Sequence, residues 1–128
     1  MWTVRAVGLA AGAARVRAER PTGAQRREEL AGFDTVAVAG GGQLDALFGG
    51  VWGQPFVLWR WARLARSVHA RFVVLSVGTG TLDRLERAVT VAALRLADYR
   101  SYRDEGSRSL LAAPELTHDD PIVPDLAY

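Results

Sequence analysis

Two short apolar runs, each ending in glycine, dominate the hydrophobic pattern of the chain. Residues 33–39 lead into three consecutive glycines, and residues 72–77 lead into a Gly-Thr-Gly turn. Short runs that are rich in β-branched residues and lack polar alternation are typical of strands buried on both faces. Apolar residues at helical spacing follow each glycine turn, at about 55–68 and 82–96. The pattern therefore predicts two strand–turn–helix units.

The remaining elements are shorter. The capping-box spacing that begins at Thr22 predicts a helix at about 23–31, and Asp83 is placed to cap the helix after the second turn. Residues 99–102 are predicted to form a strand followed by a brief helix through Leu111, and residues 121–125 an edge strand. Nearer the start, residues 4–9 are predicted as an edge strand and 10–19 as an alanine-rich helix.

The expected core of the two long helices follows from their apolar spacing. The first stripe is Val57, Trp61, Leu64, Ala65 and Val68, and the second is Leu82, Leu85, Val89, Ala92 and Leu96. Trp59 and Trp61 are expected to pack against the sheet. The alternation of strands and helices predicts an α/β fold with a Rossmann-like, doubly wound, mainly parallel sheet. We expect residues 33–128 to form this domain, after an N-terminal segment, 1–32, in which only a helix can be predicted.

Composition narrows the possible functions. All 16 basic residues are arginines, and 14 acidic residues leave a formal charge of +2, without the dense basic face of a nucleic-acid-binding protein. The chain has no cysteine, which excludes thiol chemistry and fits a cytoplasmic protein. No apolar run approaches the roughly 20 residues of a membrane span. A cytoplasmic protein that binds neither nucleic acid nor membrane is expected.

Several common catalytic motifs are missing. Neither glycine turn completes G-x-G-x-x-G, and the P-loop lysine has no counterpart because the chain contains no lysine. Nicotinamide binding and P-loop chemistry are therefore not expected. His118, Asp119 and Asp120 have metal-binding side chains, but adjacent loop residues rarely converge on one ion, so a solvated turn is the favoured interpretation. No metal site is expected.

Four segments occur in an order that resembles a known family. They are FDTVAVAGGGQL, VVLSVGTGTL, ADYRSYRDEGSRSLL and VPDLAY, and together they cover about residues 33–128. This series is similar to the N-terminal half of the polysaccharide pyruvyl transferases. Two features depart from the family pattern: residues 1–20 lack the usual glycine-rich opening loop, and the chain stops where a second domain would follow. The hypothesis is a fragment of such an enzyme, inactive alone.

The resemblance implies a fold and a reaction. Family members are similar to two-domain glycosyltransferases, with two Rossmann-like halves that face each other across a cleft. They transfer pyruvyl from phosphoenolpyruvate to two hydroxyls of a glycan, forming a ketal, and need no cofactor. A general acid protonates the enolpyruvyl methylene, a sugar hydroxyl attacks, and phosphate leaves. The proton donor is expected in the second domain, so the resemblance identifies no catalytic residue in this chain.

The resemblance also implies substrate-binding positions at the carboxyl ends of the strands. They are Gly40, Gly41, Gly42, Gly78, Gly80 and Arg103. The glycines would let substrate approach the backbone, and Arg103 would hold phosphate or carboxylate. The alternatives are plain strand-to-helix turns for the glycines and, for Arg103, an ion pair with Asp104, Glu105 or Asp125. Asp104 itself is expected to cap its helix.

Other functions stay open at this point. The chain could be a non-catalytic α/β remnant, or a subunit completed by a second chain or domain. It could also belong to a nucleotide-sugar enzyme of similar architecture. The expected partners are phosphoenolpyruvate and a glycan acceptor if the enzyme is complete.

Overall fold

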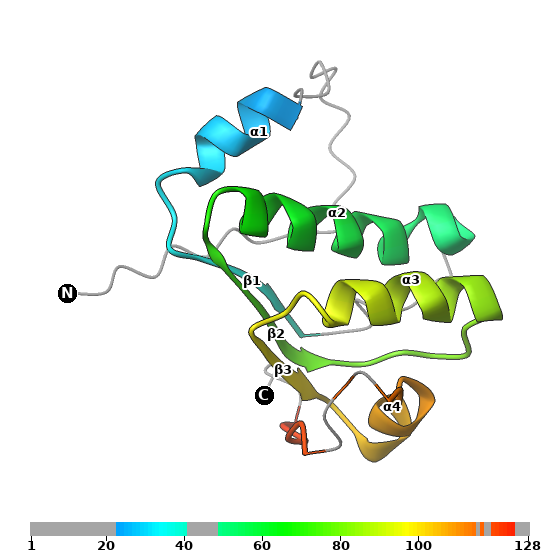
Figure 1. The fold of residues 1–128 in the computed structure, drawn as a ribbon. Coiled ribbons are helices and arrows are strands. Elements are labelled where there is room, and N and C mark those ends of the chain that lie inside the picture. Colours follow the sequence, from blue (N-terminus) through cyan, green and yellow to red (C-terminus); the bar gives the residue numbers. More distant parts are fainter. Residues whose placement is uncertain (1–22, 41–48, 115, 117–118, 125–128) are drawn as a thin grey trace.

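A three-stranded parallel sheet covered by helices forms the centre of the computed structural model, which describes residues 23–40, 49–114, 116 and 119–124 (Figure 1). In chain order the elements are α1 (Gly23–Leu30), β1 (Thr35–Ala39), the 3-10 helix η1 (Gly50–Trp52), α2 (Gln54–Ser67), β2 (Arg71–Val77), α3 (Arg84–Leu94), β3 (Tyr99–Tyr102) and α4 (Glu105–Leu110). The predictions for residues 4–9 and 10–19 lie outside the described residues.

The two predicted apolar strands pair in register. β1 and β2 are parallel neighbours, with Val36 opposite Phe72 and Val38 opposite Val74. These four side chains are buried, while the residues between them are half-buried or exposed. Parallel neighbours need a long crossover connection, and α2 supplies it between β1 and β2 as α3 does between β2 and β3. The predicted strands at 33–39, 72–77 and 99–102 are confirmed within one or two residues.

The strands lie in the consecutive order β1-β2-β3. Right-handed crossovers between strands in this order place their helices on the same face of the sheet. α2 and α3 accordingly lie side by side on one face and pack against each other (Figure 1). The predicted α/β class with a Rossmann-like parallel sheet is confirmed, and both described crossover helices cover one face.

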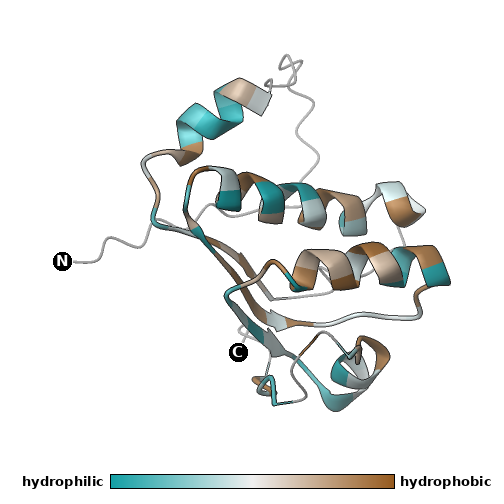
Figure 2. Ribbon diagram, viewed as in Figure 1, coloured by the Kyte–Doolittle hydropathy of each residue, from teal (hydrophilic) through white to brown (hydrophobic). Residues whose placement is uncertain are grey.

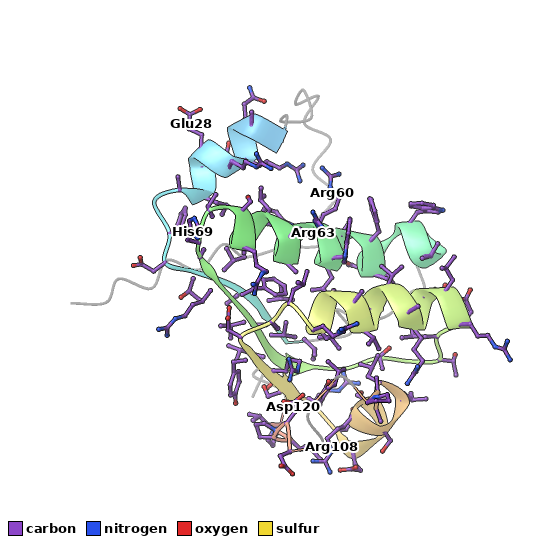
Figure 3. All side chains as sticks on the ribbon, viewed as in Figure 1. Glu28, Arg60, Arg63, His69, Arg108 and Asp120 are labelled. Carbon is purple, nitrogen blue, oxygen red and sulfur yellow. The ribbon has the colours of Figure 1, made fainter. Side chains whose placement is uncertain are left out.

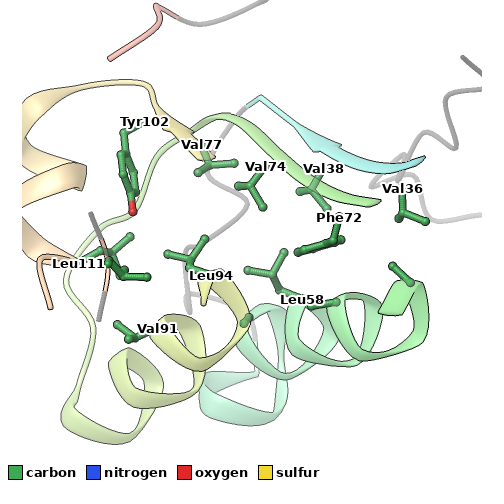
Figure 4. Close-up of a cluster of buried hydrophobic side chains, with 14 of the residues drawn as sticks. Val36, Val38, Leu58, Phe72, Val74, Val77, Val91, Leu94, Tyr102 and Leu111 are labelled. Carbon is green, nitrogen blue, oxygen red and sulfur yellow. The ribbon is translucent and has the colours of Figure 1, made fainter. Parts of the chain in front are cut away.

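Large apolar side chains from β2 and from the helices form the core between these layers. Phe72, Val74 and Val77 of β2 are fully buried, and Leu94 of α3 and Leu111 after α4 lie against the same cluster (Figure 4). Burying a side chain of this size stabilises the fold by roughly 1.5–3 kcal/mol. The central strand therefore contributes the most to the core.

The predicted apolar stripes of the two long helices are confirmed in part. Ala65 is buried, and a further set of stripe residues packs against the core while partly buried, namely Trp61, Leu64, Val68, Leu82 and Leu96. α2 buries Pro55, Leu58, Ala62 and Ala65, and α3 buries Thr90, Val91, Ala93 and Leu94. The larger residues Val57 and Leu85 are 37% and 58% exposed instead. α2 contacts both β2 and α3, and two of its buried residues, Ala62 and Ala65, are small. Figure 2 shows hydrophilic and hydrophobic residues alternating along α2. Side-chain size is therefore a poor guide to which face is buried here.

The predicted packing of Trp59 and Trp61 is confirmed in part. Both are half-buried at the margin of the core, and they line the outer side of α2 together with residues of α1. Trp59 stacks on Phe56 with ring centroids 5.8 Å apart. Both indoles thus pack against the core and also line a groove beside α1.

The segment before Pro124 joins the sheet at its β3 edge. Tyr102 and Ile122 form a parallel bridge, in which the Tyr102 amide donates to the Pro121 carbonyl and the Val123 amide to the Tyr102 carbonyl, at 3.0 and 2.8 Å. A bridge at this position confirms the predicted edge pairing. None of the helices in the described part of the chain is long and apolar enough to cross a membrane.

Asp120 is buried, which corrects the solvated turn predicted for residues 118–120. Its carboxylate receives two hydrogen bonds from the Arg100 guanidinium, at 2.8 and 3.3 Å. The two side chains are only 13% and 9% exposed. Arg100 also donates to the carbonyls of Leu94 and Ala97. The ion pair thus ties the segment before the Ile122 bridge to β3 and to the end of α3. His118 lies outside the described residues.

The buried phenol of Tyr102 makes the fold sensitive to alkaline pH. Burial, with a smaller contribution from Asp120, raises the pKa of Tyr102 from 10.0 to about 12. Because the folded protein disfavours the phenolate, the stabilisation is complete below pH 10 and is lost as the pH rises toward 12. We expect a loss of roughly 2–3 kcal/mol in the free energy of unfolding over this range, measured by urea denaturation.

Tyr102→Phe is the matched control for this prediction. The chain contains no lysine, whose ammonium group would otherwise titrate in the same pH range. The variant should therefore show a much flatter dependence on pH. Parallel curves for the two proteins would contradict the assignment to Tyr102.

Candidate functional site

The predicted ligand positions follow the carboxyl ends of the strands, which meet at one edge because the sheet is parallel. Gly40 follows β1 with a positive φ of 71°, and its amide donates to the Leu75 carbonyl at 2.9 Å. A positive φ is easily adopted only by glycine. The turn geometry alone therefore accounts for a glycine at position 40. Gly41 and Gly42 lie outside the described residues.

Gly78 and Arg103 are in direct contact. The Arg103 guanidinium lies over the Gly78 backbone so closely that a Cβ atom on Gly78 would be 2.7 Å from both Cζ and Nη2 of Arg103. Real Cβ atoms essentially never come so near another heavy atom. Gly78 is therefore needed for the position of the guanidinium, and its φ is not in the left-handed region. The structure brings together two of the residues that the resemblance singled out.

Arg103 is held from two sides. Its amide donates to the Val77 carbonyl at 2.9 Å, which fixes the backbone at the end of β3 against β2. Its Nε donates to Asp104 Oδ2 at 3.1 Å, and the side chain is 39% exposed. The ion pair proposed as an alternative role is thus present with Asp104, while Glu105 pairs with Arg108. Within the described residues, the two terminal nitrogens of Arg103 have no hydrogen-bond partner.

Asp104 caps α4, as predicted. Its Oδ1 accepts from the Ser107 amide at 2.7 Å, while its other oxygen accepts from Arg103. The bonds from Ser107, together with the smaller effect of Arg103, lower the pKa of Asp104 below 3.8. Asp104 is therefore a carboxylate at neutral pH. It orients the Arg103 guanidinium and is a poor proton donor.

The loop after Gly78 is tied to the start of α4. The Thr79 amide donates to the hydroxyl of buried Ser107 at 3.1 Å, and the Thr79 hydroxyl donates to the Gly80 carbonyl at 3.1 Å. Ser107 thus links the glycine loop to the turn that holds Arg103 and Asp104. Gly80 is half-buried in this loop.

Ser76 is a feature of this edge that the sequence analysis missed. It is buried, yet its φ is 49°, in the left-handed region that non-glycine residues rarely adopt. Its amide donates to the Ser101 hydroxyl at 2.9 Å and its hydroxyl to the Pro124 carbonyl at 3.2 Å. The register between β2 and β3 also shifts between Val74 and Val77. Strained residues of this kind concentrate at functional sites, and this one sets the direction of the chain entering Gly78.

The helix starts at this edge differ in how they are capped. Asp83 accepts from the Leu85 and Glu86 amides at 2.8 Å, and Glu86 accepts from the Asp83 amide, which completes a capping box on α3. α2 begins after Gly53 without a side-chain cap. The predicted cap at Asp83 is confirmed.

The chemistry available at this edge is anion binding. A guanidinium positioned by a carboxylate and a glycine can form two parallel hydrogen bonds to a phosphate or carboxylate. No three potential metal ligands gather in the part of the chain that the structure describes. The Gly78–Arg103 pair, with Asp104 and Ser107 behind it, is the candidate site.

Comparison with known proteins identifies the family. A search of curated proteins and a search of solved structures each found no significant match. The family model described as polysaccharide pyruvyl transferase matches residues 13–128, which extends the resemblance twenty residues toward the N-terminus. The match includes the strands, the glycine loop and the segment that contains Arg103. The chain therefore belongs to the polysaccharide pyruvyl transferase family.

Proposed function

We propose that the chain supplies the donor-binding side of a pyruvyl transfer from phosphoenolpyruvate to a glycan. In this reaction a proton adds to the methylene carbon of the enolpyruvyl group, and a sugar hydroxyl attacks the adjacent carbon. A second hydroxyl then displaces phosphate, so that one phosphoenolpyruvate and one diol give a ketal and inorganic phosphate. The Arg103 guanidinium over Gly78 is the observation that supports this proposal.

Phosphoenolpyruvate suits this site because of its charges. The molecule carries a phosphate and a carboxylate, and both are planar or forked acceptors for a guanidinium. Asp104 accepts a hydrogen bond from Nε of Arg103, so a bound anion would use the edge formed by the two terminal nitrogens. Preorganised donors of this kind stabilise a developing negative charge with little reorganisation. Arg103 would therefore hold the donor and assist the departure of phosphate.

The described part of this edge offers no general acid. Asp104 has a lowered pKa. Asp83 and Glu86 form the α3 capping box, and Glu105 is paired with Arg108. The phenol of Tyr102 is buried and keeps its proton to about pH 12. The proton would therefore come from a group outside the described residues or from a second domain or chain, and we expect residues 23–124 to provide donor binding without turnover by themselves.

Substituting Arg103 tests the proposed function. Lysine keeps the charge but loses the fork and the bond to Asp104, so we expect Arg103→Lys to weaken phosphoenolpyruvate binding by about 1.5–3 kcal/mol. Because the pair is exposed, thermal stability should change by less than about 1 kcal/mol. Calorimetric titration and a thermal melt on the same sample measure both effects.

Arg66→Lys is the matched control. Arg66 is an exposed residue in the last turn of α2, at the opposite end of that helix from the strand ends. The Arg66→Lys variant should bind phosphoenolpyruvate with the same affinity as the parent chain. A lowered melting temperature for Arg103→Lys with unchanged affinity would show that Arg103 has only a structural role.

A further inference from the structure

A second concave surface lies far from the strand ends, between α1 and the outer side of α2. It is a groove of about 500 Å³, and its charged and aromatic lining consists of Arg26, Arg27, Trp59, Arg60, Trp61 and Arg63. Arg60 and Arg63 lie on the side of α2 that faces away from the sheet (Figure 3). We call this surface the α1–α2 groove.

The α1–α2 groove is strongly positive. No aspartate or glutamate occurs between residues 46 and 82, a stretch that includes all of α2. The side chains of Arg26, Arg27, Arg60 and Arg63 form no ion pair or hydrogen bond with another described residue. Glu28 of α1 points away from the groove (Figure 3). Four arginines on one concave surface without described carboxylate partners favour an anionic ligand.

The arginines are already positioned by aromatic rings. The Arg63 guanidinium carbon lies 5.2 Å from the centre of the Trp59 ring, and that of Arg26 lies 5.8 Å from the Trp61 ring. Cation–π stacking of this kind uses the face of the guanidinium. The N–H groups around its edge stay available for acceptors such as carboxylates. The groove thus offers oriented donors beside large apolar ring edges.

We propose that the α1–α2 groove binds glycan chain that already carries pyruvate ketals. Each ketal adds one carboxylate to the polymer, which matches the arginines. The C–H groups of sugar rings can pack against the apolar surface that Trp59 and Trp61 contribute to the groove. A groove with half-buried indoles suits a chain better than a flat membrane surface, where rings would have to protrude beyond the arginines. The choice of this ligand rests on the proposed function, because it is the product of that reaction.

The α1–α2 groove would bind an already modified segment of the polymer rather than the sugar unit that reacts. The groove lies on the outer side of α2, and the Gly78–Arg103 pair lies at the end of β2 and β3. A segment that has been pyruvylated could remain bound there while another sugar unit reaches the catalytic edge. Binding of the modified segment would raise the local concentration of further acceptor units.

A matched pair of oligosaccharides tests the proposal on the full chain. The probes are a galactose oligosaccharide with pyruvate ketals and the same oligosaccharide after the ketals are removed by mild acid. We expect the ketal form to bind at least tenfold more tightly. We also expect Arg60→Gln/Arg63→Gln to lower its affinity at least tenfold without changing phosphoenolpyruvate affinity. Calorimetric titration measures both ligands.

The control variant is Arg66→Gln/Arg84→Gln, which removes the same charge from exposed helix positions outside the groove. It should bind the ketal form within twofold of the parent chain.

Equal affinity for the two oligosaccharides, or unchanged affinity in Arg60→Gln/Arg63→Gln, would overturn the proposal. Tighter binding to single-stranded DNA or to anionic lipid vesicles, lost in the same variant, would also overturn it in favour of that partner. Ketal binding without phosphoenolpyruvate binding would reject the proposed donor site and leave the groove assignment intact.

Discussion

Gly78→Ala is expected to lower the affinity for phosphoenolpyruvate by about 10- to 100-fold while leaving the fold intact. The new Cβ atom would meet the far end of the Arg103 side chain, at 2.7 Å from Cζ and Nη2. The guanidinium can move away because its side chain is flexible, so the thermodynamic cost to the fold is small. Its new position would no longer be fixed against β2, and loss of one charge-assisted interaction is worth about 1.5–3 kcal/mol.

A double-mutant cycle separates this mechanism from a general disturbance of the loop. If Gly78 acts only by making room for Arg103, Gly78→Ala should have no further effect in an Arg103→Ala background. Gly32→Ala serves as the control, because a Cβ atom at Gly32 meets nothing within 4 Å. Additive losses in the double variant would mean that Gly78 contacts the ligand independently of Arg103.

Asp120→Ala is expected to destabilise the protein by about 3 kcal/mol, which corresponds to a melting temperature lower by roughly 10 °C. The substitution leaves the buried Arg100 guanidinium without its bidentate partner. Loss of one member of a buried ion pair usually costs about 3–5 kcal/mol. We expect the lower end because the carbonyls of Leu94 and Ala97 still accept hydrogen bonds from Arg100.

The neighbouring Asp119 provides the control. It is exposed, so Asp119→Ala should change the melting temperature by no more than about 2 °C. The double variant Asp120→Ala/Arg100→Met should recover part of the loss, because it removes the unpaired charge. If Asp120→Ala melts like Asp119→Ala, the pair with Arg100 contributes nothing to stability.

Much of the fold could be predicted because it depends on local patterns. The runs before Gly40 and Gly78 are too short for helices and rich in β-branched residues, so they indicate strands without knowledge of their neighbours. Asp83 and Asp104 were predictable as caps because capping requires only a short acidic side chain at a fixed distance before the helix. Both caps are present.

Features that depend on the packing of distant segments were not predictable. The buried faces of α2 and α3 are set by the contact between the two helices, so exposed Leu85 and buried Ala62 contradict a ranking by size. The pairing of Arg100 with Asp120 joins residues 20 positions apart, and no local pattern indicates it. The same holds for the strained backbone at Ser76, which depends on Ser101 and Pro124.

The candidate site was likewise predictable only in part. The glycine turn and Arg103 could be singled out from a family resemblance, but their contact could not, because it arises from the pairing of β2 with β3. The α1–α2 groove was not predicted at all. A possible signal for it was the absence of acidic residues between 46 and 82 together with the spacing of Arg60 and Arg63. The sequence analysis instead predicts that Trp59 and Trp61 pack against the sheet.

The central position of β2 has a consequence for how the chain folds. β1 and β3 do not pair with each other, so each can join the sheet only after β2 is in place. Each pairing closes a loop that includes a whole crossover helix. The entropic cost of closing this loop arises before the contacts between the strands stabilise the pair. We therefore expect pairing of β2 with one neighbour and its crossover helix to be an early step in the folding of the described sheet.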